Sequence, residues 1–126
     1  MISNKQSSSE KKIRVGISIG DFNGVGLEVI IKTFLDSRLM EDCTPIVYGS
    51  SALAKEYRKA LNILDFSFNS IADANDANSK KANLVEVWKE EAEITFGEST
   101  QQAGKFSFLS LQEATRDLAS NKIDVL

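Results

Sequence analysis

The sequence contains no histidine and only one cysteine, one proline and one tryptophan in 126 residues. Without an imidazole, these residues provide neither a histidine general base nor a histidine ligand for a metal. The single cysteine, Cys43, has no partner for an internal disulfide, which favours a reducing compartment. Chemistry on this chain must therefore use carboxylates, lysines, hydroxyls or backbone groups, or groups supplied from elsewhere.

Long apolar runs and an excess of basic residues are also missing. No stretch approaches the ~20 apolar residues of a membrane-spanning helix, and the first residues, MISNKQSSSEKK, contain no apolar segment of signal-peptide length. The formal net charge is −3, without the basic stripe that binds nucleic acid. We therefore expect a cytoplasmic protein with no membrane and no nucleic-acid partner, in which residues 1–12 form a disordered tail.

The composition is that of an ordinary soluble domain, with 42% hydrophobic and 26% charged residues. Alternating apolar residues predict a strand at 13–19, and the apolar run 25–35 predicts a helix because Glu28 and Lys32 stand four residues apart. Capping serines and threonines predict two further helices, one beginning at Ser50 or Ser51 and one at Ser99 or Thr100. Further strands are predicted at 45–49, 66–71, 84–88 and 93–96.

The same patterns predict how these elements pack. The last helix, which stops near Asn121, is expected to bury one apolar face, made of Phe108, Leu111, Ala114, Thr115, Leu118 and Ala119. The helix after Ser50 is expected to bury Leu53, Tyr57, Ala60, Leu61 and Leu64. The polar residues 72–83 are expected to form an exposed loop. Alternating strands and helices predict an α/β fold with a mostly parallel, doubly wound sheet.

The last residues, IDVL, have the composition of a buried parallel strand that is only beginning. An isolated parallel sheet with such an ending would expose an apolar edge. We therefore expect the natural chain to continue beyond Leu126, so that residues 13–126 are the incomplete N-terminal part of an α/β domain.

Three glycines, Gly20, Gly24 and Gly26, lie within seven residues between the first strand and the first helix. Glycine permits a positive φ or a close approach to the backbone, and ligands bind at such turns in parallel sheets. The spacing matches neither the dinucleotide fingerprint nor the phosphate-binding P-loop. Two interpretations remain open: a wall for a ligand, built on backbone N–H groups, or a tight turn in which Asp21 accepts local N–H bonds. Asn23 is placed to cap the following helix.

The segment GISIGDFNGVGLEVIIK resembles the N-terminal signature of the 4-hydroxythreonine-4-phosphate dehydrogenase family, whose usual form is Gly-Asp/Glu-Pro-Ala-Gly-Ile-Gly-Pro-Glu. Five residues match this form: Gly20, Asp21, Gly24, Gly26 and Glu28. Three depart from it, because Phe22, Asn23 and Leu27 replace Pro, Ala and Pro. A second similarity, at Gly97, Gly104, Leu111, Ala114 and the residues KIDVL, extends the resemblance over most of residues 13–126.

The resemblance implies a fold of the isocitrate/isopropylmalate dehydrogenase type and an enzyme of pyridoxal phosphate biosynthesis. Such an enzyme oxidises a phosphorylated small molecule, 4-phosphohydroxy-L-threonine, with NAD or NADP and a divalent metal. The oxidised product is then decarboxylated. It also implies a homodimer, with the metal ligands and substrate-binding residues outside this chain. The loop is implied to border the cofactor, through Gly20, Asp21, Asn23, Gly24 and Gly26. No catalytic residue and no metal ligand is assigned to residues 1–126.

Two other function classes remain open from the residues alone. One is a small, non-catalytic nucleotide-binding or dimerisation module that is complete in itself. The other is a receiver-like signalling domain, which needs an acidic pair after the first strand and a phosphorylatable aspartate at the end of a middle strand. Asp21 is the one acid after the first strand, and Asp65 and Asp73 flank the possible middle strand without ending it.

We predict that residues 1–126 alone have no dehydrogenase activity, because the metal and substrate groups are missing from them. The measurement is NAD reduction by the purified chain with 4-phosphohydroxy-L-threonine and added divalent metal. Reproducible turnover would contradict the prediction.

Overall fold

The computed structural model describes residues 12–89, 94–95 and 97–126. Its centre is a parallel sheet with the strand order β1-β2-β4-β3. The strands are β1 (Ile13–Ser18), β2 (Cys43–Gly49), β3 (Asn69–Ile71) and β4 (Asn83–Glu86). Since all four run the same way, the segments that leave their carboxyl ends meet at one edge of the sheet.

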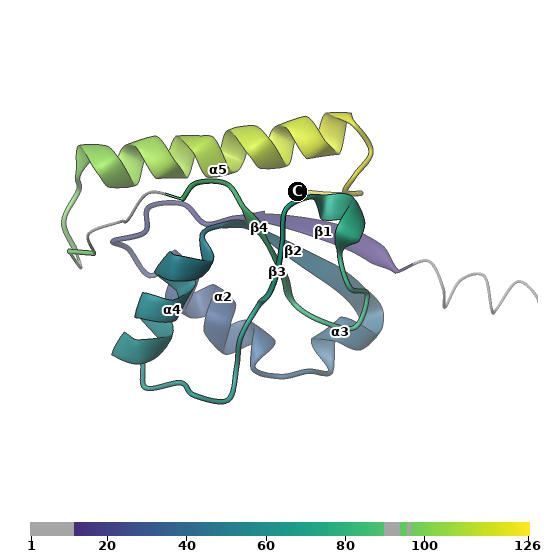
Figure 1. Ribbon diagram of the computed structural model, residues 1–126, viewed down its shortest axis with the longest axis horizontal. Helices are drawn as coiled ribbons and strands as arrows, with labels where there is room; N and C mark the ends of the chain where they lie inside the picture. The colour runs from purple at the N-terminus through teal and green to yellow at the C-terminus, as the bar shows by residue number, and fades with distance from the viewer. Residues whose placement is uncertain (1–11, 90–93, 96) are drawn as a thin grey trace, which may run out of the picture.

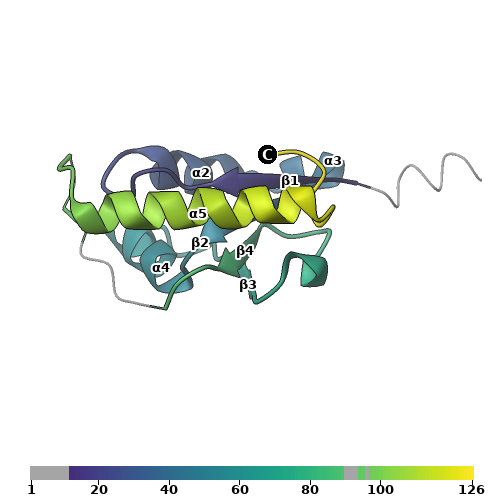
Figure 2. The same cartoon turned by 90° about the horizontal axis from the view of Figure 1, so that it is seen from above.

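Helices cover both faces of this sheet (Figure 1). α2 (Gly26–Phe34), α3 (Leu39–Asp42) and α4 (Ser51–Ala60) lie below it in that view, and α5 (Gln101–Ala119) lies above it. Seen from above, α5 runs along the sheet, where it contacts β1 and β2 (Figure 2). Alternate side chains of β2 serve the two faces: Val47 joins the cluster with α2 and α4, whereas Ile46 and Tyr48 pack with Ala114 of α5. The predicted α/β fold with a doubly wound parallel sheet is confirmed.

Most predicted boundaries are confirmed, including both capping residues. Ser50 accepts a hydrogen bond from the N–H of Leu53 at 3.4 Å, and Thr100 accepts one from Ala103 at 3.1 Å. β3 and β4 are shorter than the predicted strands. The IDVL segment contributes an isolated parallel bridge between Val125 and Val15, beside β1. The strand predicted at 93–96 is not found, because residues 94 and 95 have no regular secondary structure. Residues 93 and 96, and residues 1–11 of the predicted tail, lie outside the described residues.

The predicted buried faces of the two longer helices are partly wrong. In α5, Phe108 is 63% exposed and Leu111 48% exposed. The buried residues form a different stripe, which includes two polar side chains: Ala103, Phe106, Ser110, Ala114 and Asp117. After α4, Leu64 is 81% exposed because the helix ends at Ala60. Despite these exposed apolar residues, no helix in the described part of the chain is long and apolar enough to span a membrane.

The expectation of an exposed loop at 72–83 is confirmed for most of its residues and wrong for the others. The segment contains a short 3₁₀ helix, η1 (Ala74–Asp76), whose Ala74 is buried against the sheet. It ends at the fully buried Asn83, whose amide group organises the loop around itself. The side-chain oxygen accepts from the backbone N–H of Asn78 at 2.8 Å, and the side-chain nitrogen donates to Pro45 and Lys81 carbonyls at 3.1 and 2.9 Å. These bonds tie the loop to the start of β4.

Two buried polar contacts explain the orientation of α5. The Ser110 hydroxyl donates to the Tyr48 carbonyl at 2.7 Å and accepts from the N–H of Ile19 at 3.1 Å, so one side chain bridges β2 and the end of β1. About two helical turns further along α5, the Tyr48 hydroxyl donates to Asp117 at 2.7 Å. The pKa of Tyr48 is raised mainly by burial and further by this hydrogen bond. Because buried polar groups must be paired, these contacts select the stripe that faces the sheet.

Ser110→Ala should lower the free energy of unfolding by about 1–3 kcal/mol, because it leaves a buried N–H and a buried carbonyl unpaired. Ser107→Ala is the matched control on the same helix, where the side chain is only half-buried, and its effect should stay within about 0.5 kcal/mol. Denaturant unfolding of both variants measures the difference. Equal stabilities for the two variants would show that Ser110 does not seat the helix.

Candidate functional site

The glycine-rich loop leaves the carboxyl end of β1 and leads into α2. Its turn is closed by two local bonds: the N–H of Gly24 donates to the Asp21 carbonyl at 3.0 Å, and the N–H of Asn23 donates to the Asp21 carboxylate at 2.8 Å. Gly20 has a φ of +67°, a conformation that favours glycine. The interpretation of a tight turn with Asp21 as local acceptor is therefore confirmed, and it leaves the outer surface of the loop open for a ligand.

Gly26 is required by a close approach of backbone to backbone. A Cβ atom at this position would lie 2.9 Å from the carbonyl oxygen of Ile19, which belongs to the segment between β1 and the loop. Real Cβ atoms do not come so close to backbone atoms, so a larger residue would have to push α2 away from the strand.

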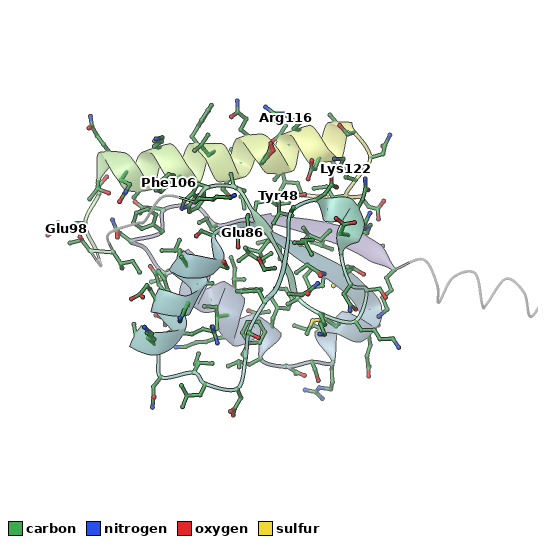
Figure 3. All side chains as sticks on the ribbon, viewed as in Figure 1. Tyr48, Glu86, Glu98, Phe106, Arg116 and Lys122 are labelled. Carbon is green, nitrogen blue, oxygen red and sulfur yellow. The ribbon has the colours of Figure 1, made fainter. Side chains whose placement is uncertain are left out.

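The middle of the loop is buried. Phe22 is fully buried, and its ring centroid lies 6.0 Å from that of Phe106 in the first turns of α5. Phe106 in turn stacks on Trp88, which follows β4, with a centroid distance of 4.4 Å and nearly parallel rings. Figure 3 shows Phe106 on the underside of α5, toward the sheet. These three rings join the loop, the end of β4 and the start of α5 into one apolar cluster.

Asn23 does not cap α2, and this prediction is wrong. The N-cap residue is Val25, and no side chain caps the helix. The Asn23 side chain turns instead toward the segment before α5: its oxygen accepts from the N–H of Thr95 at 2.6 Å, and its nitrogen donates to the Thr100 hydroxyl at 3.4 Å. Its carbonyl accepts from the N–H of Gly97 at 2.9 Å. The residue is 2% exposed, so it binds the loop to the entry of α5 from inside.

Tyr57 of α4 holds the loop from the other side. Its buried hydroxyl contacts the carbonyls of Phe22 and Gly24, the latter at 3.3 Å. Burial raises the pKa of Tyr57, and the carboxylates of Asp21 and Glu28 raise it further. The hydroxyl therefore keeps its proton and its role as donor at neutral pH.

The five predicted cofactor-facing residues thus divide into two groups. Gly20, Asp21 and Gly24 are exposed, whereas Gly26 is half-buried and Asn23 is buried. The exposed part presents an acidic side chain next to the N-terminus of α2, which has no side-chain cap. Backbone N–H groups of such a helix start suit an anion or a polar edge, and the Asp21 carboxylate suits a hydroxyl. The chemistry of this surface therefore suits a polar ligand.

A cavity of about 240 Å³ opens at the same edge of the sheet. Here the chain leaves β2 toward α4 on one face of the sheet, and it leaves β4 toward α5 on the other face. The Glu86 carboxylate in this region accepts from the N–H of Ser51 at 2.9 Å and from the Ser70 hydroxyl at 2.8 Å (Figure 3). The buried indole N–H of Trp88, which also lines the cavity, has no hydrogen-bond partner among the described residues. Local sequence patterns do not single out Glu86 or Trp88, because their setting arises from neighbouring strands.

A divalent metal does not fit the residues that the structure describes. They contain no group of three histidine, cysteine, aspartate or glutamate side chains placed to hold an ion. A divalent metal at this site would need ligands from outside the described residues.

Comparisons with known proteins agree on one family. The family model described as "Pyridoxal phosphate biosynthetic protein PdxA" matches residues 41–126. A 4-hydroxythreonine-4-phosphate dehydrogenase of Bacteroides thetaiotaomicron is 39% identical over 117 residues, which are 93% of this chain and 32% of that protein. A protein of Oceanobacillus iheyensis, provisionally named a D-threonate 4-phosphate dehydrogenase, is 29% identical over 119 residues, 92% of this chain and 36% of that protein.

The fold is also similar to that of solved structures. The crystal structure of a 4-hydroxythreonine-4-phosphate dehydrogenase from Burkholderia phymatum matches with a TM-score of 0.80 at 23% identity, over 90% of this chain and 34% of that chain. The chain thus spans about a third of the length of the relatives that it matches.

Gly26→Ala should destabilise the protein by about 1–3 kcal/mol because of the contact with the Ile19 carbonyl, and Gly26→Val should cost more. The control is Gly104→Ala in α5, where an added Cβ meets nothing within 4 Å. That change should stabilise the helix by roughly 0.5–1 kcal/mol. Thermal and denaturant unfolding of the variants measures both effects, and an unchanged stability of Gly26→Val would contradict the close packing of the loop.

Proposed function

The chain belongs to the PdxA family of pyridoxal phosphate biosynthetic proteins, and from this premise we propose that it forms the N-terminal part of a dehydrogenase that oxidises 4-phosphohydroxy-L-threonine. The oxidant is NAD or NADP, and the β-keto acid that is formed loses carbon dioxide. The observation that carries the proposal is the family match over residues 41–126, supported by 39% identity to a relative of that name.

The part of the chain that serves the reaction is the outer surface of the glycine loop. We propose that Gly20, Asp21, Gly24 and Gly26 border the cofactor, and that the buried Asn23 belongs to this wall by holding it in place. The lack of a side-chain cap on α2 supports this role, because backbone N–H groups of its first turn stay available to a polar edge of the cofactor. Asp21 can accept a cofactor hydroxyl with the carboxylate oxygen that does not receive the Asn23 N–H.

The nicotinamide supplies the hydride acceptor when the cofactor is bound. The residues of this chain bind and orient it and exclude water along one wall; they supply no proton-transferring group and no metal ligand. The divalent metal and the substrate phosphate are assigned to residues outside the chain. A homodimer is expected for the complete enzyme, as the family resemblance implies.

D-threonate 4-phosphate is the second candidate substrate, because one relative provisionally carries that name. Like 4-phosphohydroxy-L-threonine, it carries a phosphate group, a hydroxyl group and a carboxylate on the same carbon chain. The two candidates differ in the amino group, so a direct comparison of the two compounds separates them.

The test is steady-state NAD(P) reduction by the full-length enzyme with each phosphorylated compound and a divalent metal. We expect turnover with 4-phosphohydroxy-L-threonine that a chelator abolishes, and a kcat/KM at least about 100-fold lower for the unphosphorylated compound, because remote binding energy is lost with the phosphate. Preference for D-threonate 4-phosphate would select the second substrate. No turnover with either compound, together with nucleotide binding by residues 1–126 alone, would favour a non-catalytic nucleotide-binding module.

A further inference from the structure

The three residues that depart from the family signature are the three buried residues of the loop region. Phe22, Asn23 and Leu27 are 0%, 2% and 1% exposed. The usual Pro, Ala and Pro would stiffen the loop locally, since proline fixes its own φ. This chain has neither proline, so the conformation of the loop must be fixed by contacts with other elements.

The polar contacts of Asn23 supply such a connection. The side-chain oxygen accepts from the N–H of Thr95 at 2.6 Å, and the side-chain nitrogen donates to the Thr100 hydroxyl at 3.4 Å. The backbone carbonyl accepts from the N–H of Gly97 at 2.9 Å. Thr100 is itself the N-cap of α5. The backbone N–H of Asn23 also closes the Asx turn of Asp21. Asn23 therefore joins the loop turn directly to the helix entry.

We infer that Asn23 is a positioning residue that couples the glycine loop to the entry of α5 and so holds the cofactor-facing backbone of Gly20, Asp21 and Gly24 in its bound shape. An alanine here, the usual residue of the family signature, would leave the Thr95 N–H without its partner. The coupling is therefore a property of this sequence and replaces the stiffness that proline gives the signature. The cofactor half of the inference rests on the proposed function; the coupling itself does not.

Amide hydrogen exchange in the full-length protein tests the coupling. Asn23→Leu keeps the size of the side chain and removes both side-chain bonds, and Asn23→Asp keeps the acceptor for Thr95. We expect exchange of the Gly24 amide, which closes the loop turn, to become about tenfold faster in Asn23→Leu, as two lost hydrogen bonds predict. Asn23→Asp should retain most of the protection. Unchanged exchange in Asn23→Leu would overturn the inference.

A second pair of variants tests the same coupling from the helix side. Thr100→Val removes the hydroxyl that meets Asn23, whereas Thr100→Ser retains it. Thr100→Val should accelerate exchange of the Gly24 amide, and Thr100→Ser should not. Acceleration confined to the α5 amides in Thr100→Val would mean that the hydroxyl only caps the helix, and would contradict the coupling.

Kinetics of the same variants separate this inference from the proposed function. Asn23→Leu should raise the KM for NAD(P) by about tenfold and leave kcat within about twofold of the wild-type value. The reason is that the Asn23 hydrogen bonds shape the cofactor wall without touching the reacting atoms. Asn23→Asp should restore the wild-type KM. Faster exchange with an unchanged KM would refute the cofactor contact of the loop and uphold the coupling.

Discussion

The buried contacts of Asn23 and Tyr57 are the constraint on which the candidate site depends. Asn23 binds the loop to the segment that enters α5, and Tyr57 binds it to α4. The two residues act from opposite sides, so the tight turn of the loop is fixed by elements on both faces of the sheet. What remains exposed, at the carboxyl end of β1, is a short rim of backbone with the Asp21 carboxylate and the Val25 side chain.

The position of this rim follows from the way α5 lies on the sheet. Ser110 bridges β2 to the end of β1, and about two turns later in α5 Asp117 accepts a hydrogen bond from the Tyr48 hydroxyl. With the helix held at these two points, its first turns bring Phe106 against Phe22 and Trp88. The aromatic cluster fills the space under the loop, and the loop surface is left facing the edge where parallel sheets bind ligands.

Local patterns in the sequence predict the elements well, and the contacts between them poorly. The alternation of Ile13 to Ile19 and the capping roles of Ser50 and Thr100 depend on neighbours a few residues away, and they are confirmed. The buried face of α5 depends on the bond between Ser110 and Tyr48, 62 residues apart, which no apolar periodicity can reveal. Asn23 has the composition of a helix cap, yet its partners lie 72 and 77 residues along the chain. The glycine spacing alone allows a tight turn or a ligand wall, and the close packing at Gly26 depends on the position of the Ile19 carbonyl.

The most direct test of this account is a crystal structure of the full-length enzyme with NAD(P) bound. The account predicts that the loop keeps its turn, with Asn23 still bonded to Thr95 and Thr100, and that backbone or carboxylate atoms of Gly20, Asp21 or Gly24 lie within hydrogen-bond distance of the cofactor. A cofactor bound away from this loop, or a loop that leaves the Asn23 and Tyr57 contacts when the cofactor binds, would contradict it.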